Sequence, residues 1–278
     1  GVSMQTTRTA KKEKPKSKLR SNKPKAKAGS PRTAQKTIPY KLMYPDGICQ
    51  VREGYYSKVV QYQDINYQLA QEDDKRAIFD KYCEFLNYFD SSIHVQLCFY
   101  NYSGRIEDYQ VAIKIEEQKD AFNYIRQEYS QMLRNQLAKG NNGLIKNKYL
   151  VFGIEANDYR TAKTRLERIE LDIFSHLRGL GAIAQSLNGA ERLHVMHDLL
   201  NESQHKFHFD WKRLKESGLA TKDFIAPSGF DFTPTGSFGM GRKQAQVSYL
   251  QILAPELSDE LLKNFLILES DLAVTLHI

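Results

Sequence analysis

The sequence predicts an α/β or α+β fold, in which helices pack on a mixed sheet through repeated β-α-β units. Two neighbouring segments carry this prediction. Residues 148–155 form a short apolar run rich in aromatic and β-branched residues, which is typical of a strand buried on both faces. Residues 158–177 follow with apolar side chains at helical spacing. The same alternation recurs between residues 56 and 200, which favours this class over a β-sandwich or a helix bundle.

The helix of this unit has an expected start and an expected buried face. Asn157 or Asp158 can cap its first turn, because a short polar side chain accepts a hydrogen bond from the free backbone amides there. The turn Asn141-Asn142-Gly143, which precedes the strand, tolerates positive φ. The positions expected to be buried are Ala162, Leu166, Ile169, Ile173, Phe174 and Leu177. The charged positions expected to face water are Lys163, Arg165, Glu167, Arg168 and Glu170.

The chain before this unit has the pattern strand, strand, helix, strand. Residues 48–51 and 56–65 have strand-like composition. A helix is expected to begin at residues 72–74, where three acids favour a helix N-terminus, and to end before residues 90–92. Residues 93–100 alternate between apolar and polar, as a half-buried strand does. The expected buried positions are Ile78, Tyr82, Leu86 and Phe89 in the helix, and Ile93, Val95, Leu97 and Phe99 in the strand.

The remaining segments continue the alternation. Residues 119–138 and 191–200 predict helices, and residues 179–184 predict a short strand. Residues 201–245 are rich in turn signals, which indicates a small β subdomain or a long insertion. The last expected elements are a strand at 246–253, a helix at 258–268 and a strand at 272–278.

Positive charge is concentrated at the N-terminus. The 278 residues carry a net charge of +7, but residues 1–37 hold 12 of the 40 Lys and Arg and one of the 33 acids. This segment therefore carries +11, and residues 38–278 carry −4. Because it holds no aromatic and almost no large aliphatic residue, we expect the segment to be disordered. It is either a solvated leader or an electrostatic contact to an anionic membrane or to nucleic acid.

Composition indicates a soluble globular body, with 41% hydrophobic and 26% charged residues. Cys49, Cys83 and Cys98 are odd in number and lack metal-type spacing, so we expect free thiols in a reducing compartment. No apolar run approaches the roughly 18 to 20 residues of a membrane span, and the first residues are too polar for a signal peptide. The sequence therefore predicts a cytoplasmic location, which a partner could make peripheral to a membrane.

Residues 236–243 (GSFGMGRK) are the nearest match to a phosphate-binding loop. The pattern G-x-x-x-x-G-K-[ST] requires Lys and then a hydroxyl side chain after the last glycine, whereas Arg242 and Lys243 stand there. A strand is expected to follow, and phosphate binding requires a helix N-terminus. We therefore interpret the segment as a glycine-rich β-turn.

Four histidines form two H-x-x-H pairs and raise the question of a metal. These are His194, His197, His205 and His208. No Cys or carboxylate completes a four-ligand set with familiar spacing, so surface or interface histidines are the expected reading.

Glu167 and Glu170 with Arg165 and Arg168 raise the question of an acid-base cluster. Charges on the outer face of an amphipathic helix usually serve solvation only. From the residues we expect no catalytic, cofactor-binding or metal-binding site in this chain.

Four stretches carry a family resemblance. They are residues 63–70 (QDINYQLA), 85–90 (FLNYFD), 134–137 (RNQL) with 140–143 (GNNG), and 221–227 (TKDFIAP). Through them the chain resembles the N-terminal region of the VirB-like conjugal transfer ATPases of type IV secretion systems, the TraE, TrsE and TraC group. The resemblance spans residues 38–278 and leaves out the basic tail.

The resemblance implies a two-part protein. An N-terminal α/β region docks on inner-membrane components of the secretion machine, and a RecA-like motor with Walker A and B motifs hydrolyses ATP with Mg²⁺, usually as an oligomer. Residues 38–278 match the first part only. We therefore expect no ATPase activity, no cofactor and no transferable catalytic residue here, and we expect the chain to be a fragment of a longer protein.

Two other functions remain as alternatives. One is a nucleic-acid-binding module that acts through residues 1–37, without sequence preference because the tail has no aromatic side chain to stack on bases. The other is a self-contained enzyme, which the lack of a catalytic constellation in the sequence disfavours.

Overall fold

The computed structural model describes residues 33–64, 71–103, 127, 131, 144–202, 205–234, 236–250, 263–264, 268 and 270–278. Thr33–Ile278 is one compact unit. Several expectations lie outside the described residues. These are the tail up to residue 32, the turn at 141–143, and most of the helices at 119–138 and 258–268.

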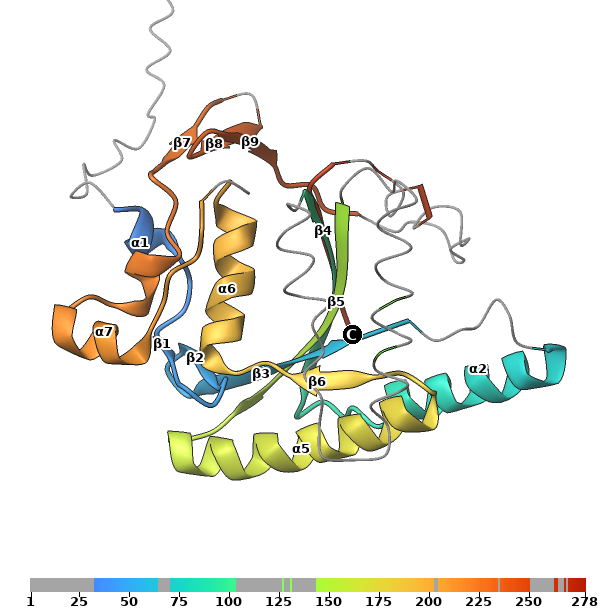
Figure 1. Cartoon of the computed structure of the whole chain (residues 1–278). Helices are drawn as coiled ribbons and strands as arrows, with labels where there is room; N and C mark the ends of the chain where they lie inside the picture. The colour runs from blue at the N-terminus through green and yellow to red at the C-terminus, as the bar shows by residue number, and fades with distance from the viewer. Residues whose placement is uncertain are drawn as a thin grey trace, which may run out of the picture. The chain divides into compact units, whose positions relative to one another are not determined.

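A sheet of seven strands forms the centre of the described unit (Figure 1). Its strands are β1 (Leu42–Met43), β2 (Cys49–Arg52), β3 (Tyr55–Tyr62), β4 (His94–Ser103), β5 (Leu144–Glu155), β6 (Ala184–Ser186) and β10 (Leu272–His277). The order across the sheet is β1-β2-β3-β5-β4-β10. Two strands share the other edge of β3: β2 pairs with its first half, and β6 pairs with its second half.

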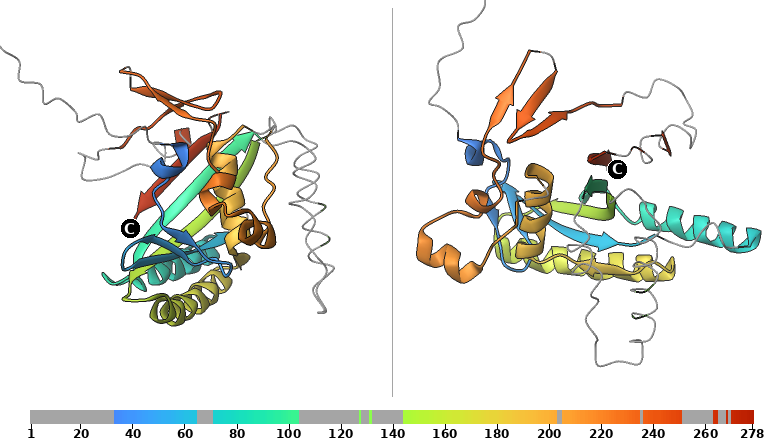
Figure 2. Two further views of the ribbon diagram at one scale, coloured as in Figure 1. Left: turned by 90° about the vertical axis from the view of Figure 1, so that its left-hand side faces the viewer. Right: turned by 45° about the horizontal axis from the view of Figure 1, so that its top comes forward.

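The helices divide between the two faces of this sheet. They are α1 (Ala34–Thr37), α2 (Glu72–Asn87), α5 (Tyr159–Gly179), α6 (Gly189–Leu200), α7 (Trp211–Ser217) and the short 3₁₀ helix η2 (Thr221–Phe224). The helices α2 and α5 lie side by side on one face, and α6 lies on the other (Figures 1 and 2). The sheet is therefore covered on both faces, as the apolar run in β5 predicts.

The connections show which kind of β-α-β unit the chain contains. The pair β3 and β4, joined through α2, has β5 between its strands, and the pair β5 and β6, joined through α5, has β3 between them. The order β6-β3-β5-β4 is that of the split β-α-β, ferredoxin-like topology. The α+β class is confirmed. All pairings among the described strands are antiparallel, which corrects the expected mixed sheet, because periodicity identifies strands but not their partners.

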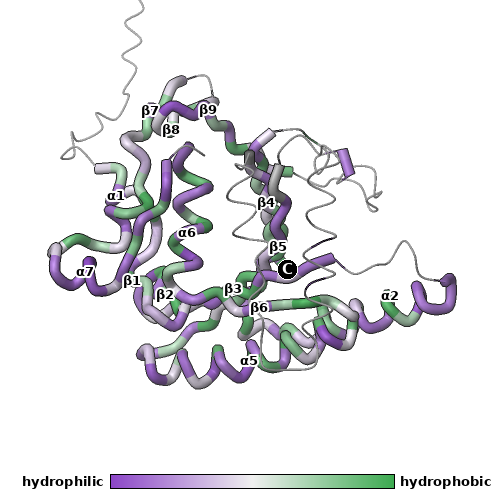
Figure 3. The backbone as a smooth tube through the Cα atoms, in the orientation of Figure 1, coloured by the Kyte–Doolittle hydropathy of each residue, from purple (hydrophilic) through white to green (hydrophobic). Residues whose placement is uncertain are grey.

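The main core lies between the sheet and the helices α2 and α5. Apolar and polar residues alternate along these elements (Figure 3). The apolar ones form one buried cluster. Asp158 is the N-cap of α5 and accepts a hydrogen bond from the Thr161 amide (2.8 Å), as expected. The predicted stripe of α5 is buried, apart from Phe174, which is half-buried.

The buried face of α2 differs from the prediction. Phe85 is the buried residue of this helix, whereas Tyr82 is 37% exposed. The reason is tertiary, because α2 meets α5 near its C-terminal end: Tyr88 donates to Asp172 (2.7 Å) and its neighbour Phe85 packs on His176. The crossing with α5, rather than the helical period alone, selects which side chains are covered.

The turn between β1 and β2 is fixed against the start of α6. Gly47 has φ of +86°, and a Cβ at this position would collide with the Leu187 carbonyl oxygen. The Gly189 amide donates to Pro45 O (3.0 Å), so the two segments lie backbone to backbone. The contact brings β2 and α6 together as two walls of one cavity.

The turn-rich region contains a second sheet, formed by β7 (Phe230–Phe232), β8 (Ser237–Met240) and β9 (Lys243–Gln246). The strand expected at 246–253 is wrong for the part that the structure describes, because β9 ends at Gln246 and residues 247–250 form no regular element. The position of β9 in the sequence is determined by its antiparallel pairing with β8 and not by apolar composition. Likewise α5 continues to Gly179, and the short strand begins only at Ala184.

Candidate functional site: a cavity between the sheet and α6

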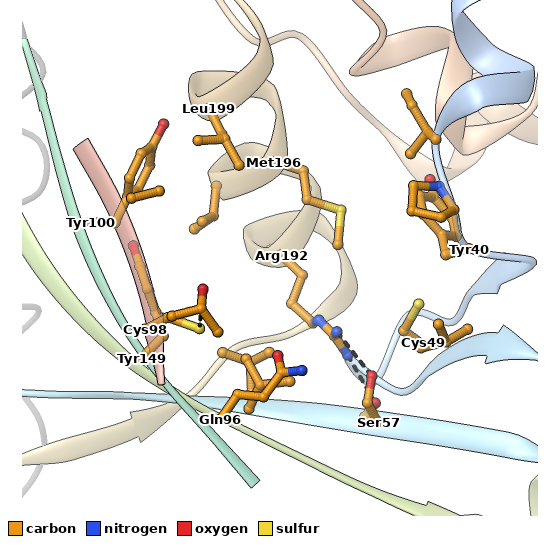
Figure 4. Close-up of a pocket in the computed structure, with 18 of the residues that line it drawn as sticks. Tyr40, Cys49, Ser57, Gln96, Cys98, Tyr100, Tyr149, Arg192, Met196 and Leu199 are labelled. Carbon is orange, nitrogen blue, oxygen red and sulfur yellow. Dashed lines mark hydrogen bonds between the residues drawn. The ribbon is translucent and has the colours of Figure 1, made fainter. Parts of the chain in front are cut away.

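A cavity of about 540 Å³ lies between α6 and the face of the sheet that is turned away from α2 and α5 (Figure 4). Its walls come from α1 and the segment that follows it, the strands β2 to β5, the helix α6, Phe230 of β7 and the edge strand β10. This volume is in the range of small-molecule sites.

Side chains alternate between the two faces along each strand, and this explains why the sheet side of the cavity is apolar. Val59, Tyr149 and Val151 face the cavity side of the sheet, while their neighbours in sequence, Val60 and Leu150, are buried toward the main core. The cavity therefore uses the second face of the strands that build the core.

The helix α6 supplies the opposite wall. Arg192, Val195, Met196 and Leu199 follow one another at i, i+3, i+4 and i+7, so they share one face of the helix. A capping box fixes the start of α6: Asn188 accepts from the Glu191 amide (3.0 Å), and Glu191 accepts from the Asn188 amide (2.7 Å).

Arg192 is the charged group of this wall and is buried. Its Nη1 donates to Gly47 O (2.7 Å) and Ser57 O (2.8 Å), and its Nη2 donates to Ser57 Oγ (3.2 Å). Its Nε is buried without a hydrogen-bond partner. Burial lowers the pKa of the guanidinium, but an arginine stays protonated at neutral pH. The side chain thus ties α6 to the β1–β2 turn and to β3.

Hydroxyl and thiol groups in the walls stay neutral. Burial raises the pKa of Tyr40 to about 12, and burial also raises the pKa of Tyr100 and Tyr149. The pKa of the Cys49 and Cys98 thiols is raised for the same reason. At neutral pH these groups can donate hydrogen bonds but carry no charge.

The segment 236–243 is a β-hairpin. Gly241 has φ of +61° and turns the chain between β8 and β9. A strand therefore follows the glycines, where a phosphate-binding loop has a helix, so the interpretation as a glycine-rich turn is confirmed.

The four histidines come only partly together. His194 stacks on Phe207 with ring centroids 5.0 Å apart, and the buried His197 packs against the same ring at 5.2 Å. Both histidines approach Asp198, with nitrogen-to-oxygen distances of 3.5 and 3.2 Å. Among the described residues no group of three His, Cys, Asp or Glu side chains is arranged to hold a metal. These rings pack as an aromatic cluster.

The prediction that Glu170 of α5 faces water is wrong. Its Oε2 accepts from Lys58 Nζ (2.7 Å), and its Oε1 accepts from Ser186 Oγ. The side chains of Lys58 and Glu170 are only 7% and 12% exposed. Lys58 points inward from β3, and a buried ammonium group requires an anionic partner. The burial of Glu170 therefore depends on the contact between α5 and β3, which the pattern of the helix alone does not reveal.

The sequence analysis missed the cavity and Arg192, although one signal was present. Arg192 lies three and seven residues before Val195 and Leu199, within the apolar stripe of α6. A charged residue inside an apolar stripe indicates a buried polar contact. Its partners, Gly47 and Ser57, are backbone and hydroxyl groups that no spacing rule identifies.

Comparison of the chain with protein-family models gave no match, and none of the curated proteins matched its sequence. In the described part of the chain, every helix is too short or too polar to cross a bilayer.

Proposed function

We propose that residues 38–278 are the N-terminal docking and assembly region of a type IV secretion ATPase for conjugal DNA transfer. In this role the region engages inner-membrane subunits at the inner face of the cell membrane. Hydrolysis of ATP with Mg²⁺ belongs to a RecA-like motor, and oligomerisation belongs to the parent protein. The observation that carries the proposal is the order of the four family-like stretches along the chain.

Two of these stretches lie in structurally important places. In residues 85–90, Phe85 is the buried anchor of α2, and in residues 221–227, Ile225 is fully buried in the smaller core beside α6. These residues therefore serve the packing of the chain and do not point to a catalytic site.

The helix layer offers a surface for docking. Phe79 on α2 is 60% exposed and Leu171 on α5 is 69% exposed. The two helices run antiparallel, since Lys81 Nζ donates to Gly179 O (3.0 Å) near one end of the pair and Tyr88 donates to Asp172 (2.7 Å) near the other. Cover by a partner protein would remove the apolar surface of both side chains from water, which is favourable.

The test is co-purification in detergent of the full chain with each inner-membrane subunit of a conjugal transfer system. We expect one subunit to be retained, and we expect Phe79→Glu with Leu171→Glu to weaken its binding at least tenfold. Phe232→Glu is the matched control, because Phe232 is equally exposed but lies on β7, outside the helix layer. Retention of no subunit contradicts the docking function, and unchanged binding by the double variant contradicts the proposed surface.

The positive tail supports a second candidate function, contact with nucleic acid or with anionic lipid. The observation in its favour is the charge of +11 on residues 1–37 against −4 on the rest. Such binding is driven by charge and weakens with salt.

A further inference from the structure

The cavity wall has an unbalanced charge. Among the described residues that line it, Arg192 is the one Lys or Arg, and there is no Asp or Glu. The acceptors of its guanidinium, Gly47 O, Ser57 O and Ser57 Oγ, are all uncharged. A buried cation without a counter-ion favours the binding of an anion that can come close to it.

One donor of this cation is unused. Nε of Arg192 is buried and has no hydrogen-bond partner, whereas buried polar atoms in proteins nearly always have one. Hydrogen bonds between a guanidinium and a carboxylate are among the strong ones, because both partners are charged. The unused donor and the unbalanced charge lie on the same side chain.

The rest of the cavity is suited to a hydrocarbon chain. Val59, Val151, Val195 and Leu199 line it, together with neutral tyrosines. Burial of an alkyl chain against such a wall is favourable in proportion to the apolar area removed from water.

We propose that this cavity binds a monoanionic amphiphile of the medium-chain fatty acid class, with its carboxylate at Arg192 and its alkyl chain along the wall between α6 and the sheet. The proposal does not depend on docking to a membrane subunit. A neutral apolar ligand and an apolar side chain of a partner protein are the competing occupants.

Met196 provides a means of access to the buried donor. It lies next to Arg192 on the cavity face of α6 (Figure 4). An unbranched thioether side chain changes rotamer easily. Since Nε is buried, the head group can reach it only if a neighbouring side chain moves, and Met196 is a neighbour that can change rotamer while the backbone stays in place.

The first test uses calorimetry on the 278-residue protein with three ligands whose alkyl chains have the same length. They are decanoate, decanol and decyltrimethylammonium, each below its micelle concentration. We expect decanoate to bind at least tenfold more tightly than decanol, and we expect the cation to bind most weakly. Equal affinity for the three ligands, or no binding of decanoate, overturns the proposal.

The second test uses variants. Arg192→Met should bring decanoate affinity down to that of decanol, and Val195→Trp, which fills the cavity from α6, should abolish binding of both. Arg168→Met, at an exposed position of α5 on the other side of the sheet, is the matched control and should bind decanoate as the wild type does. If Arg192→Met does not fold, the result for Val195→Trp tests the proposal alone. Decanoate binding as strong as that of the wild type, by Val195→Trp or by a folded Arg192→Met, overturns the proposal.

Discussion

Lys58 and Glu170 form an ion pair with little exposure between β3 and α5, and Ser186 of β6 donates to the same carboxylate. A charge at this depth has a large desolvation cost, which only a well-placed partner offsets. Loss of one partner alone therefore destabilises the fold more than the intact pair stabilises it.

We predict that Lys58→Met lowers the free energy of unfolding by about 3 kcal/mol, because it leaves Glu170 buried without its partner. The double variant Lys58→Met with Glu170→Gln should recover at least half of this loss, since the amide oxygen still accepts from Ser186 and no charge remains. Urea denaturation followed by circular dichroism measures both.

The exposed pair Arg52 and Glu155 is the control for this cycle. Their side chains are 63% and 68% exposed at a distance of 3.1 Å, so Glu155→Gln should change the stability by less than about 1 kcal/mol. A Lys58→Met variant as stable as the wild type would show that the buried pair is dispensable.

At the scale of elements, Asp46 joins the β1–β2 turn to the first turn of α5. Its Oδ2 accepts from Tyr159 OH (2.5 Å) and from Lys163 Nζ (2.9 Å), and its Oδ1 accepts from the Ile48 amide (3.2 Å). Burial alone would raise the pKa of Asp46, but these hydrogen bonds outweigh it and the pKa is lowered. The carboxylate form is therefore favoured in the folded protein.

This shift gives stability a definite pH dependence. Because the folded pKa lies below the unfolded value of about 4, the contribution of Asp46 is fully present above pH ~4 and is lost as the pH falls through the folded pKa. We predict that Asp46→Asn lowers the stability at pH 6 by about 1 kcal/mol after allowance for solvent screening, or roughly 2–4 °C in Tm. The gap to the wild type should narrow as the pH falls below about 4.

Thermal scans between pH 6 and pH 3 measure this prediction. Tyr159→Phe removes one of the three hydrogen bonds and should give an intermediate loss. A gap that stays constant over the whole range would mean that the Asp46 side chain acts through packing and not through its charge.

At the scale of the whole molecule, the chain divides into residues 1–32 and the compact unit Thr33–Ile278. The compact unit begins at Thr33. Within it α1 occupies Ala34–Thr37, and Thr37 lines the cavity. The preceding 32 residues carry +10, so their removal changes the net charge from +7 to −3. The net positive charge of the chain therefore comes from residues 1–32.

We predict that deletion of residues 1–32 leaves Tm unchanged within about 1 °C and abolishes sedimentation with anionic vesicles at low salt, because each Lys or Arg near such a surface contributes on the order of 1 kcal/mol. Binding to single-stranded DNA should be lost in parallel. Neutral vesicles are the control. Retained DNA or vesicle binding by the deletion variant would assign it to the folded body.

The limits of sequence reasoning follow the range of the interactions. The N-cap at Asp158, the stripe of α5 and the strand in β5 could be predicted, since each depends on residues within one or two turns or on the period of one strand. The burial of Phe85 and Glu170 could not be predicted. The crossing of α2 with α5 buries Phe85, and the buried position of Lys58 places Glu170 beside it.

By itself the sequence determined the α+β class, most of the strands and helices, and the concentration of positive charge in the tail, because these depend on composition and local period. Only the tertiary structure decided the antiparallel pairing, the strand order β6-β3-β5-β4 and the cavity. Arg192 reaches Gly47 and Ser57, which lie 145 and 135 residues away. Contacts at such separation arise from chain topology, and local patterns in a sequence do not encode them.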